Sequence, residues 1–495
     1  MTSTASAHPP LAPPKPPEIA WWKLAILPLL LVAVRVALAG MMELSGDEAY
    51  YWTWSRNLAG GYFDHPPMVA WLIRVSVGIF RTNELGVRMP AILLGAGSML
   101  VAGDIARICG ATSQTVLRLQ VALFCLPILQ LHSALMTPDA PAMFFTLAAI
   151  SWGLRYLIEP SSPRHWLMLG SACGLAMLSK YTALLPVATI LLFVLIARPR
   201  YALQTIAAGA LAVLVLWPML IWNYQHDWVS FRFQLSHGIG TDDKSSWMTL
   251  GDYAGGQILV ATPVLAGLML WAAARTIRRG KDVRTRLLGV VGAATLLFFA
   301  FTSLRHKVEV NWPSMAWPIL LILLELHVQR LGGWSLRALR TGVIVAAVAM
   351  VVLSMPPAFL LRLHPGGALG AVGGWEPLAS KIDSMAKGLP IYATRYQDAG
   401  LLAFYLPGRP YVRVLRRSAD RMSQFDLPRC PRMPDGQFVI VDNGNLPLGR
   451  SVLQIGDHNY NLDITARKNC EVDMDGLRTR SRALRWANSR EGNGG

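Results

Sequence analysis

Long apolar stretches alternate with short polar segments along most of the chain. A transmembrane helix needs about 20 predominantly apolar residues. Eleven stretches meet or approach this length, at about 21–41, 86–108, 115–135, 140–157, 165–180, 183–197, 202–222, 253–275, 286–304, 311–329 and 338–361. We therefore predict an all-α polytopic membrane protein, with about 11 transmembrane helices between residues 21 and 361.

Basic side chains are concentrated in alternate loops between these stretches. They lie near Arg107 and Arg118, Arg155 and Arg164, Arg198 and Arg200, from Arg275 to Arg286, and from Arg330 to Arg340. Because cytoplasmic loops carry an excess of Lys and Arg, this distribution predicts a cytoplasmic N-terminus. The outer loops are then 42–85, 136–139, 223–252, 305–310 and everything after 362. Aromatic residues near the membrane surface predict interfacial helices in the first of them.

The two ends of the chain depart from the apolar pattern. Residues 1–20 are rich in Pro, Ala, Ser and Thr and are predicted to be a disordered cytoplasmic tail. From about 376 the apolar runs shorten, and the segments 389–394 and 437–442 are typical of strands. We predict a small C-terminal α/β domain at 376–485 on the outer face. Cys430 and Cys470 in this domain could pair if the compartment is oxidising.

Composition favours a membrane protein over a soluble globular protein and over a nucleic-acid-binding protein. Of the 495 residues, 53% are hydrophobic and 15% are charged, which is too little charge for the surface of a soluble protein of this length. Much of the net charge of +17 lies in the basic loops, where it suits contact with anionic lipid head groups. Neither zinc-finger spacing nor a basic helix suited to reading bases is found, which argues against nucleic-acid binding.

Asp47 and Glu48 directly follow the first apolar stretch, where a membrane meets water. A carboxylate at the centre of a membrane helix costs about 2.5–3.5 kcal/mol, so such groups normally lie in water or in a site. Ser45 and Glu48 fit a capping box, which gives Glu48 a structural explanation beside a substrate-binding one. Capping does not require Asp47, so Asp47 is the better candidate for a catalytic base, with Tyr51 beside it as a substrate contact.

The pair Asp64–His65 lies in the same outer loop, ahead of two prolines. Asp64 is suited to capping a helix that begins at these prolines, and the pair is equally suited to binding a head group or a metal ion. His226, in another outer loop, is a third candidate ligand. A divalent metal held by Asp64, His65 and His226 is therefore an open alternative, and no cofactor is required.

Asp139 and Lys180 both lie on the predicted outer side of the membrane. Asp139 is suited either to capping the fourth apolar helix or to acting with Asp47 on a hydroxyl group. Lys180 and the neighbouring Tyr181 are candidate substrate contacts. Lys180 is on the predicted outer side, although the positive-inside rule places the excess of Lys and Arg in cytoplasmic loops. This placement favours binding of a phosphate group by Lys180 over simple snorkelling to the interface.

A further outer cluster contains Arg305, Lys307, Glu309 and Asn311. Basic residues on the outer side need an explanation, and a phosphate-bearing lipid provides one. The alternative is a solvated loop, which applies to Glu309 in particular. We expect this cluster to contact substrate.

In this order along the chain, these segments resemble those of GT-C glycosyltransferases. The resemblance is to the bacterial branch of the dolichyl-phosphate-mannose protein mannosyltransferase superfamily, which includes enzymes that add aminoarabinose or galacturonic acid to lipid A. The resembling segments are 46–52, 62–67, 137–141, 179–182, 226–231 and 308–313. The combination is specific, whereas no single segment is, and the C-terminal part is similar only loosely.

The resemblance implies that residues 21–361 form the catalytic domain of a glycosyltransferase in the bacterial inner membrane. Such an enzyme moves a sugar from a polyprenyl phosphate carrier to an acceptor hydroxyl or phosphate on lipid A, a glycan or a protein, at the periplasmic face. The resemblance also implies that Asp47 is the catalytic base, that Asp139 is a second acid and that Lys180 lies near the carrier phosphate. The aminoarabinose-transferring relatives have a Glu–Lys pair in place of Asp64–His65, so the sugar preference is not implied.

A transporter or flippase for a lipid-linked sugar is the alternative function. It would use the same outer residues for binding, without chemistry. Transporters often contain paired internal repeats, and no such repeat is visible in the sequence.

Overall fold

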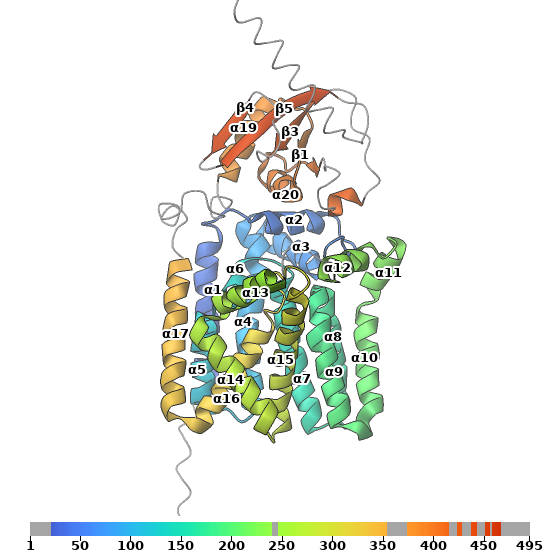
Figure 1. The fold of residues 1–495 in the computed structure, drawn as a ribbon. Helices are drawn as coiled ribbons and strands as arrows, with labels where there is room; N and C mark the ends of the chain where they lie inside the picture. Colours follow the sequence, from blue (N-terminus) through green and yellow to red (C-terminus); the bar gives the residue numbers. More distant parts are fainter. Residues whose placement is uncertain are drawn as a thin grey trace, which may run out of the picture.

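The computed structural model describes residues 21–239, 246–353, 374–414, 423–427, 437–442, 451–455 and 458–466. A bundle of long helices is covered at one end by shorter helices, and a mixed sheet with two helices lies beyond them (Figure 1). The predicted tail at 1–20 and both Cys430 and Cys470 lie outside the described residues.

Most of the described helices form the bundle. They are η1 (Trp21–Ala25), α1 (Ile26–Ala39), α4 (Glu84–Ile108), α5 (Ser113–Cys125), α6 (Pro127–Ala134), α7 (Asp139–Ile158), α8 (Pro163–Ser179), η2 (Tyr181–Ala183), α9 (Leu184–Ala197), η3 (Pro199–Tyr201), α10 (Ala202–Val215), α14 (Pro263–Arg279), α15 (Val283–Ser303), α16 (Ala316–Leu331) and α17 (Gly333–Leu353). The shorter helices at one end are α2 (Gly46–Arg56), α3 (Met68–Phe80), α11 (Trp217–Gln225), α12 (Val229–Ile239) and α13 (Ser246–Ala261). Of these, α2, α12 and α13 lie across the end of the bundle (Figure 1). The loop 42–85, predicted to be the first outer loop, therefore contains helices, as the sequence predicted.

Three of the predicted apolar stretches, 115–135, 202–222 and 253–275, are each divided between two helices. Helices α5 and α6 meet at 66°, and the segments Trp247–Ala261 and Pro263–Arg279 meet at 100°. The prediction of one continuous helix is wrong in these three places. Pro127, Pro218 and Pro263 each stand in the first turn of the second helix. Proline is tolerated there but cannot continue a preceding helix, because it lacks the backbone N–H and clashes with the turn before it.

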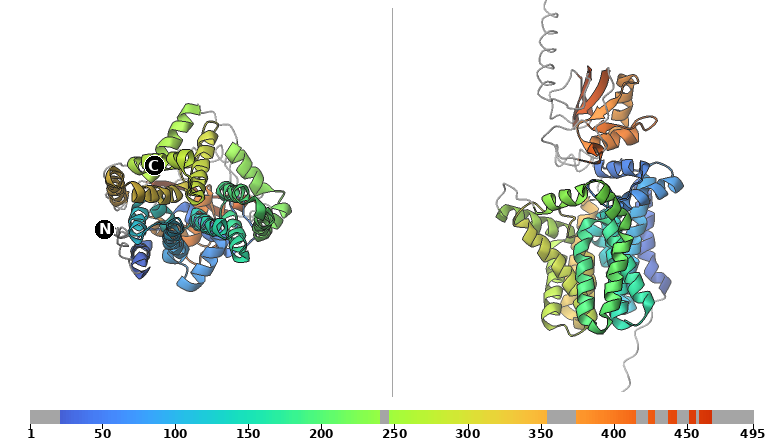
Figure 2. Two further views of the ribbon diagram at one scale, coloured as in Figure 1. Left: turned by 90° about the horizontal axis from the view of Figure 1, so that it is seen from below. Right: turned by 90° about the vertical axis from the view of Figure 1, so that its right-hand side faces the viewer.

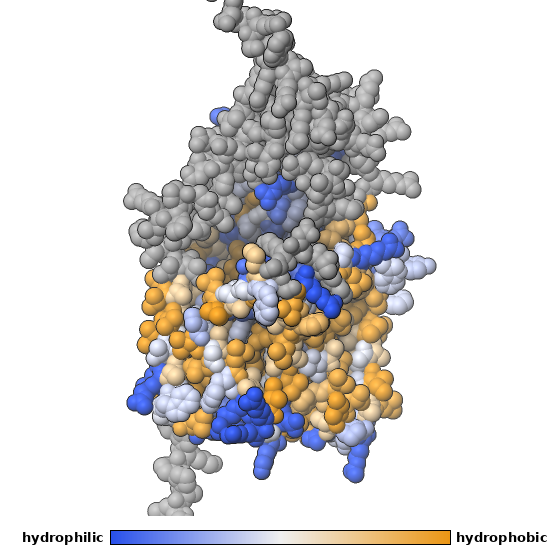
Figure 3. Space-filling view, viewed as in Figure 1, coloured by the Kyte–Doolittle hydropathy of each residue, from blue (hydrophilic) through white to orange (hydrophobic). Residues whose placement is uncertain are grey.

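Five described helices are long and apolar enough to cross a membrane, or up to eight if each bent pair is one span. The number of about 11 therefore stays a prediction. Apolar side chains cover much of the side of the bundle (Figure 3), and Leu29, Ile196 and Leu203 are 65%, 71% and 76% exposed. Because soluble proteins rarely expose so large an apolar area, this surface is suited to facing lipid.

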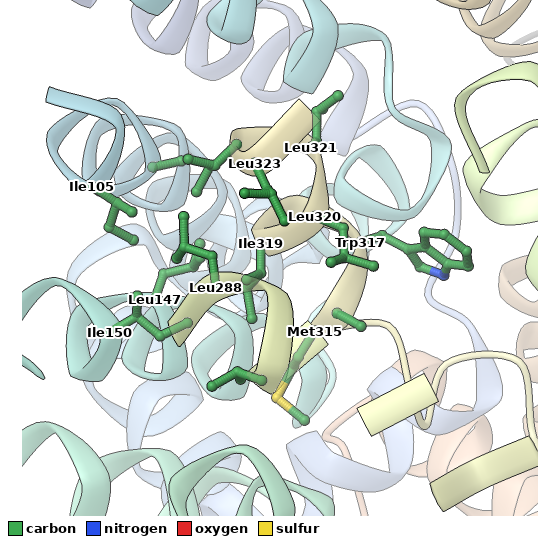
Figure 4. Close-up of a cluster of buried hydrophobic side chains, with 14 of the residues drawn as sticks. Ile105, Leu147, Ile150, Leu288, Met315, Trp317, Ile319, Leu320, Leu321 and Leu323 are labelled. Carbon is green, nitrogen blue, oxygen red and sulfur yellow. The ribbon is translucent and has the colours of Figure 1, made fainter. Parts of the chain in front are cut away.

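The core of the bundle surrounds α16. Every residue of α16 from Ala316 to Leu326 is buried. Figure 4 shows Leu320 and Leu323 of this helix among side chains from α4, α7 and α15. A helix that is apolar on all sides is a central helix. Because α16 is held in the core, the segment 308–313, which leads into this helix, is held in place as well.

The C-terminal part contains a five-stranded mixed sheet. Its elements are α19 (Trp375–Ala386), β1 (Ile391–Ala393), α20 (Tyr396–Tyr405), β2 (Arg413–Val414), η5 (Gln424–Asp426), β3 (Gln437–Asp442), β4 (Ser451–Ile455) and β5 (His458–Ala466). The strand order is β2-β1-β3-β5-β4, with β1 parallel to β2 and β3, and β5 antiparallel to β3 and β4. Both segments expected to be strands, 389–394 and 437–442, contain strands, whereas the predicted limit at 485 falls outside the described residues.

Helix α20 packs closely on α2, so the C-terminal part sits directly beyond this helix (Figures 1 and 2). A Cβ atom placed on Gly400 of α20 would lie 2.8 Å from the backbone N of Tyr50. A Cβ atom on Gly46 would lie 2.6 Å from Cβ of Gln397. Glycine at both positions thus allows a close approach of the two helices at the end of α2 that carries Asp47.

Glu48 connects the start of α2 to the bundle. It completes the capping box with Ser45 that the sequence indicated. Its side chain is fully buried and pairs with Arg88 of α4, with Nη2 of Arg88 2.9 Å from Oε2. Oε1 also accepts the backbone N–H of Met136 at 3.1 Å. Glu48 therefore holds α2, α4 and the segment before Asp139 together.

Replacing Arg88 with Met should destabilise the protein by about 3–5 kcal/mol, because it leaves the Glu48 carboxylate buried without its cation. The measurement is thermal unfolding of the purified full chain in detergent. Arg155→Met is the matched control, since its partner Asp104 is 40% exposed and the loss of a partly exposed pair should cost at most about 1 kcal/mol. Equal melting temperatures for the two variants would contradict the prediction.

Candidate active site

A cavity of about 350 Å³ lies where α2, the ends of α7 and α8, α12 and α20 come together. Nine residues predicted from the sequence line it: Asp47, Tyr51, Asp64, His65, Asp139, Lys180, Tyr181, Glu309 and Asn311. The other lining residues are Tyr50, Thr137, Thr182, Phe233, Gln234, Trp312 and Tyr396. Segments far apart in the sequence thus converge on one polar cavity at a single end of the bundle.

Four predicted site residues, Glu48, His226, Arg305 and Lys307, are not among the lining residues. Glu48 pairs with Arg88 behind α2. The guanidinium of Arg305 lies 5.2 Å from the ring centroid of Phe301. Lys307 pairs with Glu309, with Nζ 2.9 Å from Oε1. The structure therefore gives no support for direct substrate contact by Glu48, His226 or Arg305, and it places Lys307 beside the lining residue Glu309.

Asp47 reaches the cavity because the Ser45 cap sets the start of α2. It lies in the first turn of this helix, where the helix dipole stabilises a carboxylate. Tyr396 of α20 lines the same cavity, and burial together with the nearby charge of Asp47 raises the pKa of its hydroxyl. The Tyr396 hydroxyl therefore stays protonated at neutral pH and can donate a hydrogen bond beside Asp47.

Lys180 and Asp139 form a buried ion pair at the inner wall of the cavity. Nζ of Lys180 lies 2.6 Å from Oδ1 of Asp139, and the two side chains are 4% and 5% exposed. Oδ2 of Asp139 accepts a hydrogen bond from Nδ2 of Asn311 at 2.9 Å and one from Thr137 at 3.4 Å. Since both oxygens of Asp139 have donors, this carboxylate is better placed to orient Lys180 than to accept a proton.

The segment before Asn311 is fixed by a hydrogen-bonded chain from α13 and α16. Gln257 of α13 donates from Nε2 to the carbonyl oxygen of Val310 at 3.1 Å. Its Oε1 accepts the indole N–H of Trp317 at 2.9 Å. Gly256 lies against Val310, because a Cβ atom at Gly256 would be 2.7 Å from Cγ2 of that residue. The position of Asn311 relative to Asp139 therefore depends on close packing of α13.

Gly256→Ala should lower activity by displacing Val310 and, with it, the hydrogen bond from Asn311 to Asp139. Overpacking of this kind typically costs about 1–3 kcal/mol. Gly255→Ala is the matched control, because nothing lies within 4 Å of a Cβ atom there. Initial rates of both variants would be compared in one assay, and equal rates would show that the contact with Val310 does not affect the site.

The loop from Tyr62 to His65 is bound to its surroundings on several sides. Asp64 is 2% exposed, and its Oδ2 accepts the hydroxyl of Tyr50 at 2.7 Å. Gln234 of α12 donates to the carbonyl oxygen of Asp64 at 2.7 Å. Ser230 donates in the same way to the carbonyl oxygen of Tyr62 at 2.5 Å. The carboxylate of Asp64 is thus held in one orientation at the cavity wall.

Burial, assisted by the positive charge of Lys180, lowers the pKa of His65 to about 3. The imidazole is therefore neutral at physiological pH. Its Nδ1 is buried and has no hydrogen-bond partner in the described part of the chain. A neutral ring of this kind can hydrogen-bond to an uncharged polar group of a ligand.

The proposed metal ligands do not form a ligand set. Asp64 and His65 line the cavity, whereas His226 stacks on Trp222 at a centroid distance of 4.1 Å. Across the residues that the structure describes, no group of three or more His, Cys, Asp or Glu side chains is placed to hold a metal ion. The hypothesis of a metal at Asp64, His65 and His226 therefore has no support in this geometry.

Seven lining residues were not predicted as site residues. Four of them lie within the resembling segments, namely Tyr50, Thr137, Thr182 and Trp312, whereas Phe233, Gln234 and Tyr396 lie outside those segments. Phe233 and Gln234 follow the segment 226–231 by only a few positions, so extending that segment along a helix would have found them. Tyr396 lies in the loosely similar C-terminal part, and no local feature marks it.

Comparison with known proteins supports the resemblance drawn from the sequence. A family model described as dolichyl-phosphate-mannose-protein mannosyltransferase matches residues 64–222. The chain is 31% identical over 289 residues to the lipid A galacturonosyltransferase RgtD of Rhizobium johnstonii, covering 55% of this chain and 58% of that protein. It is 26% identical over 332 residues to an undecaprenyl phosphate-alpha-4-amino-4-deoxy-L-arabinose arabinosyl transferase of Pseudomonas aeruginosa, covering 63% and 58%.

Among solved structures, the fold is similar to that of ArnT from Cupriavidus metallidurans bound to undecaprenyl phosphate. The TM-score is 0.65 at 18% identity, with 92% of this chain and 99% of that chain covered. The matched segments span less than two thirds of the length of the two curated relatives. The predicted resemblance to GT-C glycosyltransferases is confirmed.

Proposed function

We propose that this chain, which has the GT-C glycosyltransferase fold, transfers a sugar from an undecaprenyl phosphate-linked donor to a lipid A or other lipopolysaccharide acceptor. The names of the relatives support both the reaction class and the two substrates. The observation that carries the proposal is one cavity that contains Asp47 together with the buried pair of Lys180 and Asp139.

The reaction is a single displacement at the anomeric carbon. The acceptor hydroxyl gives its proton to the Asp47 carboxylate as its oxygen forms a bond to that carbon. The bond between the anomeric carbon and the carrier phosphate oxygen breaks, and undecaprenyl phosphate leaves with the electron pair. General base catalysis of this kind typically contributes about 10²–10⁴-fold.

Lys180 is the group that stabilises the leaving phosphate. Its ammonium is nearly fully buried, and a fixed charge in such an environment stabilises developing negative charge more strongly than one in water. Asp139, which is itself held by Asn311, accepts one hydrogen bond from this ammonium and so holds it in place. In this proposal Asp139 acts by positioning Lys180, and the role of second acid that the resemblance implied stays a prediction.

The cavity opens toward the periplasm in this proposal. Helix α7 begins at Asp139 in the cavity and runs for 20 residues, a length of about 30 Å at 1.5 Å per residue. Its last turn contains Arg155, which belongs to one of the basic loops. An excess of Arg and Lys at the end away from the cavity favours a cytoplasmic location for that end.

A transfer assay tests this function. The purified full chain in proteoliposomes would be incubated with undecaprenyl phosphate carrying radiolabelled 4-amino-4-deoxy-L-arabinose or galacturonic acid, with lipid A as acceptor. Label that appears on lipid A is the expected result. Label that crosses the bilayer while still attached to the carrier would instead support a transporter or flippase.

A further inference from the structure

Gln424 of the C-terminal part makes two contacts beside the cavity, one with Tyr50 of α2 and one with the loop from Tyr62 to His65. Its backbone N–H donates to the hydroxyl oxygen of Tyr50 at 2.6 Å. Its side-chain Oε1 accepts the backbone N–H of Phe63 at 2.8 Å. Tyr50 in turn donates to Oδ2 of Asp64 at 2.7 Å. One contact therefore acts on the Asp64 carboxylate through the Tyr50 hydroxyl. The other holds the backbone of Phe63, the residue before Asp64.

Aromatic rings from the C-terminal part hold Tyr50 in the orientation that this chain of hydrogen bonds requires. The ring centroids of Tyr50 and Tyr396 are 4.5 Å apart, and those of Tyr50 and Phe425 are 5.7 Å apart. Tyr50 itself is 1% exposed. Because its ring cannot turn without displacing these neighbours, the hydroxyl stays directed at Asp64.

From these contacts we infer that Gln424 is a positioning residue for substrate recognition, and that the C-terminal part completes the active site through it. The inference rests on the proposed function, because it assigns a role in that same reaction. Asp64 lines the cavity, and a carboxylate held by protein donors can accept hydrogen bonds from a sugar hydroxyl or ammonium group. Gln424 fixes where this carboxylate points.

The role is distinct from general stabilisation of the interface between the C-terminal part and α2. Arg56 of α2 also reaches across that interface, with Nη1 3.4 Å from the carbonyl oxygen of Pro410. Neither Arg56 nor Pro410 lines the cavity. Small displacements of a positioned group can lower rates by about 100-fold. Loss of the hydrogen bond from the Phe63 N–H to the Gln424 side chain should therefore affect turnover far more than loss of the Arg56 contact.

The test compares Gln424→Leu, Gln424→Glu and the control Arg56→Gln. Leu removes the acceptor of the Phe63 N–H, whereas Glu keeps it. With radiolabelled undecaprenyl phosphate sugars as donors, Gln424→Leu should lower kcat/KM by about tenfold or more, mainly through a higher KM for the donor. Gln424→Glu should recover most of this loss, and Arg56→Gln should match the wild type. Equal kcat/KM for the Leu variant and the wild type would overturn the inference.

Hydrogen exchange gives a second readout that does not depend on turnover. The peptide containing Phe63 should exchange faster in Gln424→Leu and at the wild-type rate in Gln424→Glu. Unchanged exchange in Gln424→Leu would show that Gln424 does not fix the loop. Absence of transfer by the wild-type protein would contradict the proposed function itself, and the exchange result would still decide whether Gln424 holds this loop.

Discussion

Asp47→Asn is expected to lower the rate of sugar transfer by about 10²–10⁴-fold, because the amide cannot accept the proton of the acceptor hydroxyl. The substitution preserves the size and shape of the side chain. It removes a favourable charge from the first turn of α2, which typically costs only about 0.3–1 kcal/mol of stability. The variant should therefore fold and still bind undecaprenyl phosphate, since Lys180 is unchanged.

The measurement is kcat in the transfer assay, together with carrier binding by the same preparation. Asp252→Asn is a suitable control, because Asp252 lies on α13 and does not line the cavity. Turnover by Asp47→Asn close to that of the wild type would remove Asp47 from its proposed role. Loss of both turnover and folding would require a comparison with Asp47→Ser before any role could be assigned.

Much of the helical fold follows from local features of the sequence. The Ser45 and Glu48 pattern predicted the cap of α2, and the structure contains both of its hydrogen bonds. Apolar length located the helices of the bundle. It did not reveal the bends at Pro127 and Pro263, because average hydrophobicity is insensitive to a single proline.

The pairing of distant residues was beyond sequence reasoning. The sequence placed Asp139 and Lys180 on the same predicted side of the membrane, but their direct contact depends on how α7 and α8 pack. The same applies to Gln424, which meets Tyr50 across more than 370 positions. Local patterns specify the segments, whereas tertiary packing decides which polar groups neutralise one another and which stay available to substrate.

Lys180→Met is expected to have two separable effects. It leaves the Asp139 carboxylate buried without its cation, which should lower stability by about 3–5 kcal/mol. It also removes the charge proposed to bind the carrier phosphate, so binding of undecaprenyl phosphate should weaken. Asp139→Asn separates the two effects, because it breaks the same pair but keeps the Lys180 ammonium. This variant should also melt at a lower temperature, yet it should keep more of the carrier binding than Lys180→Met does.

Lys307→Met is the matched control for stability. Lys307 also pairs with a carboxylate, Glu309, at 2.9 Å, but these side chains are 53% and 49% exposed. An exposed pair contributes about 0–1 kcal/mol because water and salt screen it, so Lys307→Met should melt close to the wild-type temperature. Thermal unfolding in detergent and equilibrium binding of undecaprenyl phosphate provide the two measurements. If Lys180→Met bound the carrier as tightly as the wild type, Lys180 would have only a structural role, and the leaving phosphate would need a different cation.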